Sequence, residues 1–181
     1  HYNRGMQEQF SRTALLLGAD GVEKLTKSRV AVFGLGGVGS WCAEALARAG
    51  VGRLTLVDKD VVEESNINRQ LMATVRTVGR PKVDALKDRL LDINPEAEIS
   101  AVDKVYSEET AAEFDIAGYD YVIDAIDTLK NKVCLIINAS DAGPVFFSSM
   151  GAALKVDPSR VRTGNFWKVR DCPLGAALRK K

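Results

Sequence analysis

A glycine-rich run follows a short apolar stretch early in this sequence. Residues 34–39 read Gly-Leu-Gly-Gly-Val-Gly, which satisfies G-x-G-x-x-G, and they lie between a β-branched stretch typical of a buried strand and a helical pattern. In that setting Gly34 allows a tight turn, Gly36 lets the backbone approach a phosphate, and Gly39 lets helix and strand pack closely. The helix N-terminus adds unpaired amides and a positive dipole end. The run predicts an anion-binding loop; the alternative is a turn without a ligand.

An acidic residue, Asp58, ends the next stretch that we expect to be a strand, 19 residues after Gly39. A carboxylate at this place can accept hydrogen bonds from ribose hydroxyls, so a nucleotide with a free ribose is the expected ligand. The glycine run and Asp58 do not distinguish NAD, FAD and ATP, and a dehydrogenase is one interpretation.

Two cations lie in polar loops beside the expected glycine loop. Arg69 is in the run 65–70 and Lys82 ends the run 78–82. A guanidinium can bind phosphate oxygens through two parallel hydrogen bonds, and a lysine at a helix start supplies a point charge. The pair suits a triphosphate better than a hydride donor. The alternative, that both are ordinary solvated residues, stays open on the residues alone.

Two carboxylates, Asp124 and Asp127, follow the apolar stretch 121–123. The carboxyl ends of parallel strands line the ligand crevice of such folds, so we expect both to face the same pocket. A carboxylate there can hold Mg²⁺, which would bridge phosphates. We assign the metal to Asp127 and leave Asp124 open, since one of the two could instead cap the helix expected near Thr128.

Strand and helix patterns alternate along the chain, which predicts a Rossmann-like α/β fold with a mostly parallel sheet and helices on both faces. Beyond Gly151 the stretches 154–156 and 161–164 flank an Asp-Pro-Ser turn and predict a hairpin, an antiparallel extension of the sheet. A last helix is expected from residue 174 to the chain end, so we interpret 1–181 as one domain that is cut short at its C-terminal side. The predicted strands are 29–33, 53–57, 99–102, 121–123 and 145–147; the predicted helices are 6–18, a short one around 22–25, 41–49, 83–93, 110–117 and 130–142.

Composition sets the broad class. A hydrophobic fraction of 46% and a charged fraction of 27% are ordinary for a folded, soluble protein. No apolar stretch approaches the ~20 residues that span a bilayer, and residues 1–5 do not resemble a signal peptide, so we expect a cytoplasmic protein with no membrane contact. The net charge of +1 gives no argument for nucleic acid as a partner.

Neither histidine nor cysteine is expected to take part in the chemistry of this protein. The only histidine is His1, so acid, base and metal roles fall to Asp, Glu, Lys and Arg. Three cysteines are too few and too scattered for a disulfide framework or a zinc site. We expect Cys42 and Cys134 to be buried packing residues, and Cys172 to be more exposed but hindered as a thiolate by Asp171. None is expected to be a nucleophile.

Together these motifs resemble the ThiF/MoeB/HesA superfamily of ubiquitin-activating-enzyme-like adenylating proteins. The resemblance spans essentially the whole chain, and residues 66–82 are its most discriminating part. It rests on the order and separation of six runs: Gln9-Phe10-Ser11-Arg12, 34–39, Asp58-Lys59-Asp60, 65–70, 79–82 and 124–127.

The resemblance implies an ATP- and Mg²⁺-using adenylation domain. It implies that Asp58 binds the ribose, that Arg69 and Lys82 bind the phosphates, and that Asp127 holds Mg²⁺. It also implies a homodimer in which Arg12 reaches the ATP site of the neighbouring subunit. The catalytic residues would then be Arg12, Arg69, Lys82 and Asp127, and the nucleotide-binding residues Gly34, Gly36, Gly37, Gly39, Asp58, Asp60, Asn66, Arg69 and Lys82.

Four stretches are similar to one branch of the superfamily, the tRNA threonylcarbamoyladenosine dehydratases: 37–41, 43–48, 121–127, and 171–174 with Leu178-Arg179. That branch implies tRNA as partner and ATP-dependent adenylation of the threonyl carboxylate on modified adenosine 37, followed by ring closure with net loss of water. Gln9 and the run 148–153 depart from the usual pattern on the substrate side. Two alternatives remain: an activator of a ubiquitin-like sulfur-carrier protein, and an NAD-binding Rossmann oxidoreductase.

Overall fold

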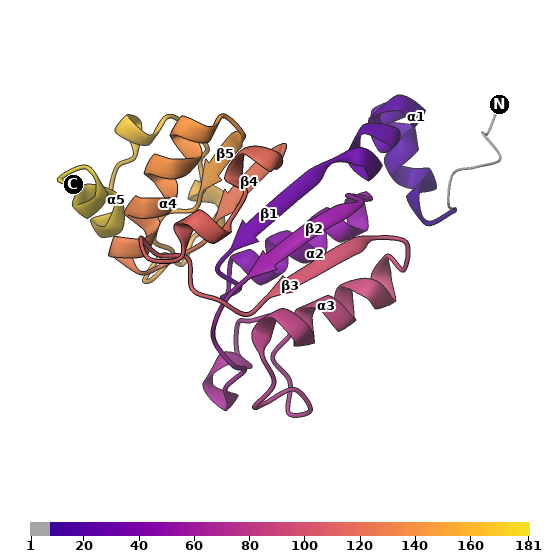
Figure 1. Cartoon of the computed structure of the whole chain (residues 1–181), viewed down its shortest axis with the longest axis horizontal. Coiled ribbons are helices and arrows are strands. Elements are labelled where there is room, and N and C mark those ends of the chain that lie inside the picture. Colours follow the sequence, from indigo (N-terminus) through magenta and orange to yellow (C-terminus); the bar gives the residue numbers. More distant parts are fainter. Residues whose placement is uncertain (1–7) are drawn as a thin grey trace.

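Five strands form one sheet in the computed structural model, which describes residues 8–181 (Figure 1). The strand order is β3-β2-β1-β4-β5, and every neighbouring pair is parallel. Because β1 is central, with β2 on one side and β4 on the other, the glycine run that follows it lies at the point where the strand order reverses, where such sheets bind ligands. The strands are β1 (Arg29–Phe33), β2 (Arg53–Val57), β3 (Glu98–Val102), β4 (Tyr121–Asp124) and β5 (Val145–Ser148).

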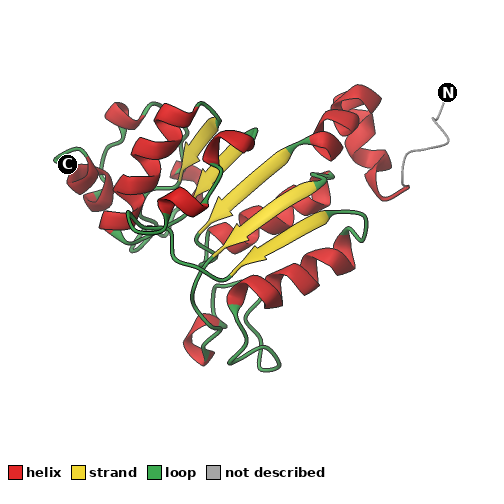
Figure 2. Cartoon of the chain, in the orientation of Figure 1, coloured by secondary structure: helices red, strands yellow, loops and turns green. Residues whose placement is uncertain are grey.

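Helices cover both faces of the sheet (Figure 2). Side chains alternate between the faces of a strand, so Val30 and Val32 of β1 pack with α2 and α3 while Ala31 and Phe33 pack with α4. This arrangement confirms the predicted Rossmann-like fold class. The helices are α1 (Ser11–Lys27), α2 (Gly39–Ala49), α3 (Lys82–Ile93), α4 (Leu129–Ala142) and α5 (Pro173–Leu178).

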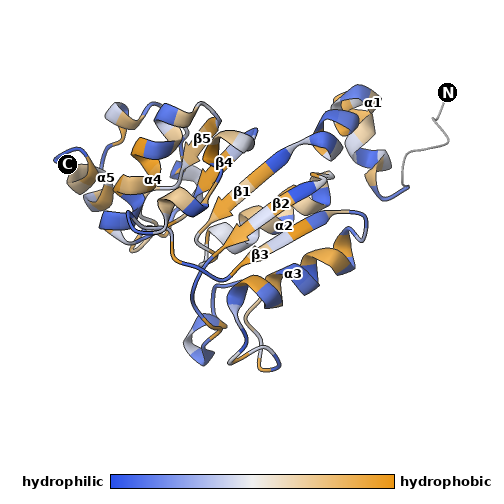
Figure 3. Cartoon of the chain, in the orientation of Figure 1, coloured by the Kyte–Doolittle hydropathy of each residue, from blue (hydrophilic) through white to orange (hydrophobic). Residues whose placement is uncertain are grey.

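Hydropathy follows these layers. Figure 3 shows hydrophobic residues concentrated on the strands, while α3 alternates hydrophobic and hydrophilic positions as expected for a helix with one buried face. Among residues 8–181, no helix combines the length and apolar character needed to cross a membrane.

Glycines end or break several helices. Gly50 follows α2 with φ 101° and Gly143 follows α4 with φ 94°, the left-handed conformation that closes many helices. Gly18, with φ 75° and ψ 167°, interrupts α1 and divides it into the two helical pieces that the sequence predicts. The predicted start of the first piece at Met6 lies outside the described residues.

The helix predicted over 110–117 is wrong. The structure has two short 3-10 turns there, Ala111–Glu113 and Ile116–Gly118. Local side-chain bonds explain the difference: the Thr110 hydroxyl donates to the Val105 carbonyl, and the Asp115 carboxylate accepts from the Gly118 amide. Such bonds compete with helical ones.

The predicted hairpin beyond Gly151 is also wrong. Residues 154–164 contain a 3-10 turn, Pro158–Arg160, and no strand, so the sheet has no antiparallel extension. Leu154 has φ 62° and the Asp157 carboxylate accepts hydrogen bonds from both the amide and the hydroxyl of Ser159, which fixes a local turn. The last helix, α5, ends at Leu178 rather than running through residue 181.

Candidate nucleotide-binding site

The glycine loop fits tightly against its neighbours at two positions. A Cβ on Gly34, where φ is 85°, would lie 2.7 Å from the Ala125 carbonyl oxygen, and one on Gly39 would lie 1.8 Å from the Gly34 carbonyl oxygen. No side chain fits at either place without moving backbone. A Cβ on Gly36 would meet nothing within 4 Å, so the backbone there is open to a bound group.

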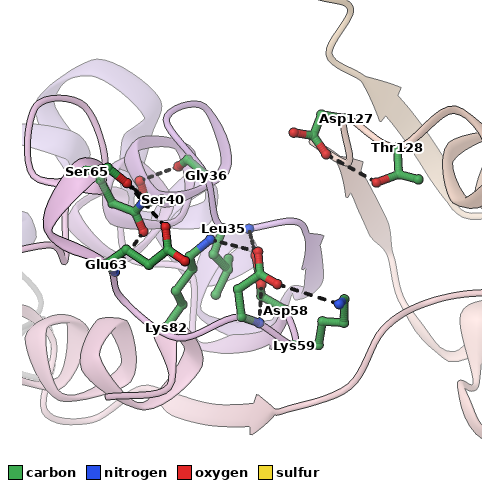
Figure 4. Close-up of polar contacts among 12 residues, drawn as sticks. Leu35, Gly36, Ser40, Asp58, Lys59, Glu63, Ser65, Lys82, Asp127 and Thr128 are labelled. Carbon is green, nitrogen blue, oxygen red and sulfur yellow. Dashed lines mark hydrogen bonds and ion pairs between the residues drawn. The ribbon is translucent and has the colours of Figure 1, made fainter. Parts of the chain in front are cut away.

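Asp58 joins the glycine loop to the chain that follows β2 (Figure 4). Its Oδ2 accepts from the Leu35 amide at 2.7 Å and its Oδ1 accepts from the Asp60 amide at 2.9 Å. A carboxylate offers about four acceptor positions, so both oxygens of this half-buried group retain capacity for a ligand hydroxyl.

Lys82 is buried at the start of α3, with only 6% of its surface exposed. Its Nζ lies 3.1 Å from Oδ2 of Asp60, and its amide donates to the Asp60 carbonyl at 2.9 Å. Asp60 is more than half exposed, so the carboxylate can move aside for an anion that competes for the ammonium. A buried cation at a helix N-terminus is a strong attractor for phosphate.

Arg69 lies against the glycine loop. A Cβ on Gly37 would be 3.4 Å from Cγ of Arg69. The guanidinium donates through Nη1 to the Ser65 carbonyl at 3.0 Å and to Oδ1 of Asn68 at 2.9 Å, and the Trp41 indole donates to the Arg69 carbonyl at 3.0 Å. The structure therefore places Arg69 beside the predicted phosphate loop, with several guanidinium N–H groups uncommitted.

Asn66 shapes the turn that precedes Arg69. Its Oδ1 accepts from the Glu63 amide at 3.1 Å, and its backbone carbonyl accepts from the amides of Arg69 and Gln70. With 6% of its surface exposed, Asn66 supports the loop from beneath.

Ser40, which was not among the predicted site residues, is fully buried beneath the glycine loop. Its hydroxyl donates to the Gly36 carbonyl at 2.7 Å and accepts from the Leu71 amide at 3.1 Å. Ser40 thus ties the glycine loop to the loop that carries Arg69. A serine directly after the glycine motif, at the start of a helix, is the signal that could have identified it.

Asp124 does not face the site, so the expectation that both carboxylates share one pocket is wrong. Its side chain is fully buried and contacts Lys132 Nζ at 2.8 Å, the Ser148 hydroxyl at 2.6 Å and the Ile126 amide at 3.0 Å. Asp124 lies on the strand face that packs against α4, which also carries Lys132. Burial raises the pKa of Asp124, against the opposing effects of Lys132 and the hydrogen bonds.

Lys132 was missed by the sequence reasoning. It is fully buried, and its Nζ also donates to the Ile126 carbonyl at 2.9 Å, so it holds the 125–127 loop as well as Asp124. Lys132, Leu135 and Ala139 are the buried residues of α4, and a lysine in that i, i+3, i+7 stripe is the available signal.

Asp127 is exposed on the loop after β4, and Figure 4 shows it apart from the group around Asp58 and Lys82. Its carboxylate is 3.4 Å from the Thr128 hydroxyl. Thr128 precedes α4 without a side-chain cap, so neither aspartate caps that helix. Residues 8–181 contain no group of three or more His, Cys, Asp or Glu side chains that could hold a metal. Any metal here would take few protein ligands.

Arg12 is remote from these residues within one chain. It is exposed on α1, which Figure 1 shows beyond the amino end of β1, whereas the glycine loop follows the carboxyl end of that strand.

Of the cysteine expectations, the one for Cys172 is wrong. Cys172 is buried at the start of α5, where its Sγ accepts from the Gly175 amide at 3.4 Å. Burial acts to raise the pKa of this thiol, but hydrogen bonds from the backbone of Gly175 and Gly151 and the charge of Lys155 outweigh it and lower the pKa. Cys42 and Cys134 are half-buried, and burial raises the pKa of each.

Known proteins are similar to this chain in sequence and in structure. The pattern of the ThiF family matches residues 10–172. The tRNA threonylcarbamoyladenosine dehydratase of Bacillus subtilis is 50% identical over 176 residues, 97% of this chain and 69% of that protein. The molybdopterin-synthase adenylyltransferase of Escherichia coli is 42% identical over 123 residues, 67% of this chain and 49% of that protein.

Among solved structures, the E. coli tRNA N6-threonylcarbamoyladenosine dehydratase in complex with ATP superposes with a TM-score of 0.95 at 36% identity, covering 98% of this chain and 73% of that one. The chain spans about two thirds of the length of the bacterial dehydratases that it matches, 65% for the E. coli protein.

Proposed function

Because this chain belongs to the ThiF family, we propose that it uses ATP to adenylate a carboxylate, and that the carboxylate is the threonylcarbamoyl group of a modified adenosine in tRNA. The observation that carries this choice is the 50% identity to the B. subtilis tRNA threonylcarbamoyladenosine dehydratase, which extends over 97% of the chain. Residues 1–181 act as one adenylation domain of a cytoplasmic enzyme.

The ATP site of this proposal is the glycine loop and the two cations beside it. Asp58 binds the ribose with its free lone pairs, the open backbone at Gly36 receives a phosphate, and Lys82 and Arg69 neutralise the phosphate charge. Asp60 holds the Lys82 ammonium until the phosphate arrives, and Asn66 keeps the Arg69 loop in place. The likeness to the ATP complex of the E. coli dehydratase supports this assignment.

The chemical step is acyl adenylation. A carboxylate oxygen of the substrate attacks the α-phosphorus of ATP, the bond from that phosphorus to the bridging oxygen breaks, and pyrophosphate leaves. A nitrogen of the same substrate then attacks the acyl carbon, expels AMP and closes a ring, with the nitrogen's proton passing to solvent. The substrate loses one water in total, which ATP hydrolysis balances. Catalysis rests on positioning and charge neutralisation by Lys82 and Arg69 and needs no histidine.

The exposed Asp127 carboxylate fits a Mg²⁺ ion. Among the described residues, the Asp127 side chain contacts only Thr128, and weakly, and Mg²⁺ commonly takes one or two protein carboxylates with phosphates and waters completing its shell. A Mg²⁺ ion held by Asp127 would supply positive charge to offset the charge of the phosphates.

Arg12 completes the site of a second subunit in this proposal. Its exposure, and its position beyond the opposite end of β1 from its own glycine loop, support a role across an interface. Mixing Arg12→Ala and Lys82→Ala variants, each inactive alone, tests it: random reassociation gives hybrid dimers with one intact site, and about a quarter of the wild-type activity returns. No recovery after subunit exchange refutes a shared site.

The function is tested by incubating the protein with ATP, Mg²⁺ and threonylcarbamoyl-modified tRNA, and measuring AMP and the mass of the digested nucleoside. We expect AMP and a nucleoside lighter by one water, and a loss of about 10²- to 10³-fold in rate for Lys82→Met, with Lys87→Met on the same helix as control. AMP formed only with a diglycine-tailed carrier protein would favour the second candidate, a sulfur-carrier activator, which the E. coli molybdopterin-synthase adenylyltransferase supports. Tight binding of NAD without ATP would refute both.

A further inference from the structure

The segment after β5 carries a charge unlike that of the rest of the chain. Residues 155–181 contain eight Lys and Arg and two Asp and Glu, a net charge of +6, whereas residues 1–154 contain 17 basic and 22 acidic residues, a net charge of −5. The near-neutral total therefore conceals a strong separation of charge. The net charge of +1 over the whole chain gave no sign of a nucleic-acid partner, but this segment alone is strongly basic.

The cations of this segment lack counter-charges. Within residues 8–154, ten of the sixteen Lys and Arg side chains form ion pairs with carboxylates. None of the eight cations in 155–181 appears in any ion pair of the described chain, and all but the half-buried Arg179 are exposed. Unpaired surface cations bind polyanions by releasing the counterions of the phosphates.

A large aromatic side chain stands among these cations. Trp167 is 71% exposed in the 3-10 turn Phe166–Lys168, and its ring packs edge-on against Phe166 with the ring centroids 5.2 Å apart. Exposed Lys168 and Arg170 lie one and three residues after it. An exposed indole between phosphate-binding cations suits stacking against an unpaired base, the usual way in which proteins bind single-stranded regions of RNA.

The chain leads into this segment from the carboxyl end of β5. β5 ends at Ser148, and the Ser149 amide donates to the Asp124 carbonyl at 2.8 Å, at the point where the chain turns toward Asp127. Figure 1 shows the segment, coloured orange to yellow, continuing beside α4. A polyanion bound along it would lie on the side of the molecule formed by α4 and α5.

We propose that residues 155–181 form an RNA-binding surface, with Arg160, Lys168 and Arg170 on phosphates and Trp167 stacked on an unpaired base. The proposal rests on the proposed function, in which the RNA is the substrate tRNA. An anionic membrane fits less well because the segment offers two 3-10 turns and the six-residue α5 rather than an amphipathic helix. A protein partner fits less well because the centre of a protein interface is depleted in lysine and rich in buried apolar groups.

The test compares tRNA binding by two triple variants without ATP. R160Q/K168Q/R170Q removes three cations of the segment, and K24Q/R53Q/K87Q removes three cations elsewhere. The probe is fluorescein-labelled tRNA lacking the modification, titrated at several salt concentrations. We expect the first variant to bind at least about tenfold more weakly and to reduce the salt slope by about two to three, since each of the three phosphate contacts contributes roughly 0.7 to 0.9. The second variant should bind like the wild type.

A second readout uses tryptophan fluorescence. The tRNA should quench part of the wild-type emission, and the W167F variant should lose that quenching while Trp41 still emits. Equal loss of affinity in both triple variants, no loss in the first, or no wild-type binding in low salt overturns the proposal. So does complete displacement of the tRNA by phosphatidylserine vesicles.

Failure of this surface and failure of the proposed function give different results. If the first triple variant forms AMP from modified tRNA with an unchanged kcat/KM, the surface is wrong and the adenylation stands. If the wild type binds tRNA through the segment but forms no AMP with modified tRNA, the adenylation is wrong and the surface stands.

Discussion

The substitution Lys132→Met removes the charge of an ion pair whose two side chains are both 0% exposed. Lys132 contacts the Asp124 carboxylate at 2.8 Å and donates to the Ile126 carbonyl at 2.9 Å. Methionine preserves most of the apolar stem but supplies neither the charge nor the donor. The variant therefore tests whether this pair fixes the loop between β4 and α4.

The expected loss follows from the partners that remain. Removing one member of a buried ion pair typically costs about 3–5 kcal/mol, because the other charge is left unpaired. Asp124 keeps its hydrogen bonds from Ser148 and the Ile126 amide, so we expect the lower end, about 3 kcal/mol. With a urea m-value of ~2 kcal/mol/M, the midpoint of unfolding should fall by about 1.5 M.

The loss should depend on pH. Without Lys132, the pKa of Asp124 lies further above its unfolded value, because burial already raises it and Lys132 lowers it. A raised carboxyl pKa gives stability that is present below the unfolded pKa and is lost as the pH rises through the folded pKa. The difference between wild type and variant should therefore be largest at neutral pH and narrow toward acid.

Urea unfolding followed by circular dichroism measures the effect, and ATP titration measures whether the Asp127 loop has moved. The matched control is Lys130→Met on the same helix, since Lys130 is exposed and pairs with Glu108 and Glu109 at the surface. D124N/K132M should recover part of the loss, because it leaves no buried charge. If K132M unfolds at the same urea concentration as K130M, the pair does not stabilise the fold as argued.

Two further predictions concern the glycine loop and the α2–α3 contact. The Gly36→Ala variant should unfold at the wild-type temperature but bind ATP about tenfold more weakly, because its Cβ would project into the open space where a phosphate binds. The Gly39→Ala variant should lose about 3 kcal/mol or more of folding free energy, because its Cβ would lie 1.8 Å from a backbone oxygen. Calorimetric melts and ATP titrations measure both effects, and equal Tm values for the two variants would contradict this prediction. Burial acts to raise the pKa of Glu44, but hydrogen bonds and charge from Arg89 and Arg48 outweigh it and lower the pKa, so its contribution is present above the unfolded pKa and is lost as pH falls through the folded one. Glu44→Gln should thus lower Tm at pH 7 and match the wild type in acid, and a Tm difference that persists at pH 3 would count against it.

Most of the fold could be predicted from periodicity. The bounds of β1 and β2 agree with the predicted ones because each strand is a run of mostly buried apolar residues that starts at an exposed arginine and ends before a glycine or a charged residue. The structure of residues 110–117 could not be predicted in this way. A helical hydrophobic pattern does not reveal the hydrogen bonds donated by Thr110 and accepted by Asp115, which form 3-10 turns instead. The predicted hairpin failed for the same kind of reason at Asp157.

The candidate site was predictable where motif residues are adjacent to β1. The contacts of Asp58 with the glycine loop follow from the ends of two neighbouring parallel strands. The prediction that Asp124 faces the ligand pocket was wrong. Strand alternation places Asp124 on the same buried face as Val122, and a charge is tolerated there because Lys132 of α4 pairs with it, which the strand pattern does not reveal. The role expected of Arg12 could come only from resemblance, since a single chain does not bring it near the site.

Because β1 lies at the centre of the sheet, its two neighbouring strands pair with it at different stages of folding. Phe33 pairs with Val57, 24 residues later, but also with Asp124, 91 residues later. During synthesis β1 and β2 can pair before α4 is available to pack against Ala31 and Phe33. The pairing of β1 with β4 is the slower one because it closes a longer loop. The glycine loop is walled by Ala125 on that late side. ATP binding therefore requires the complete sheet. A nascent chain that stops before residue 125 should be unable to retain ATP and should depend on chaperones.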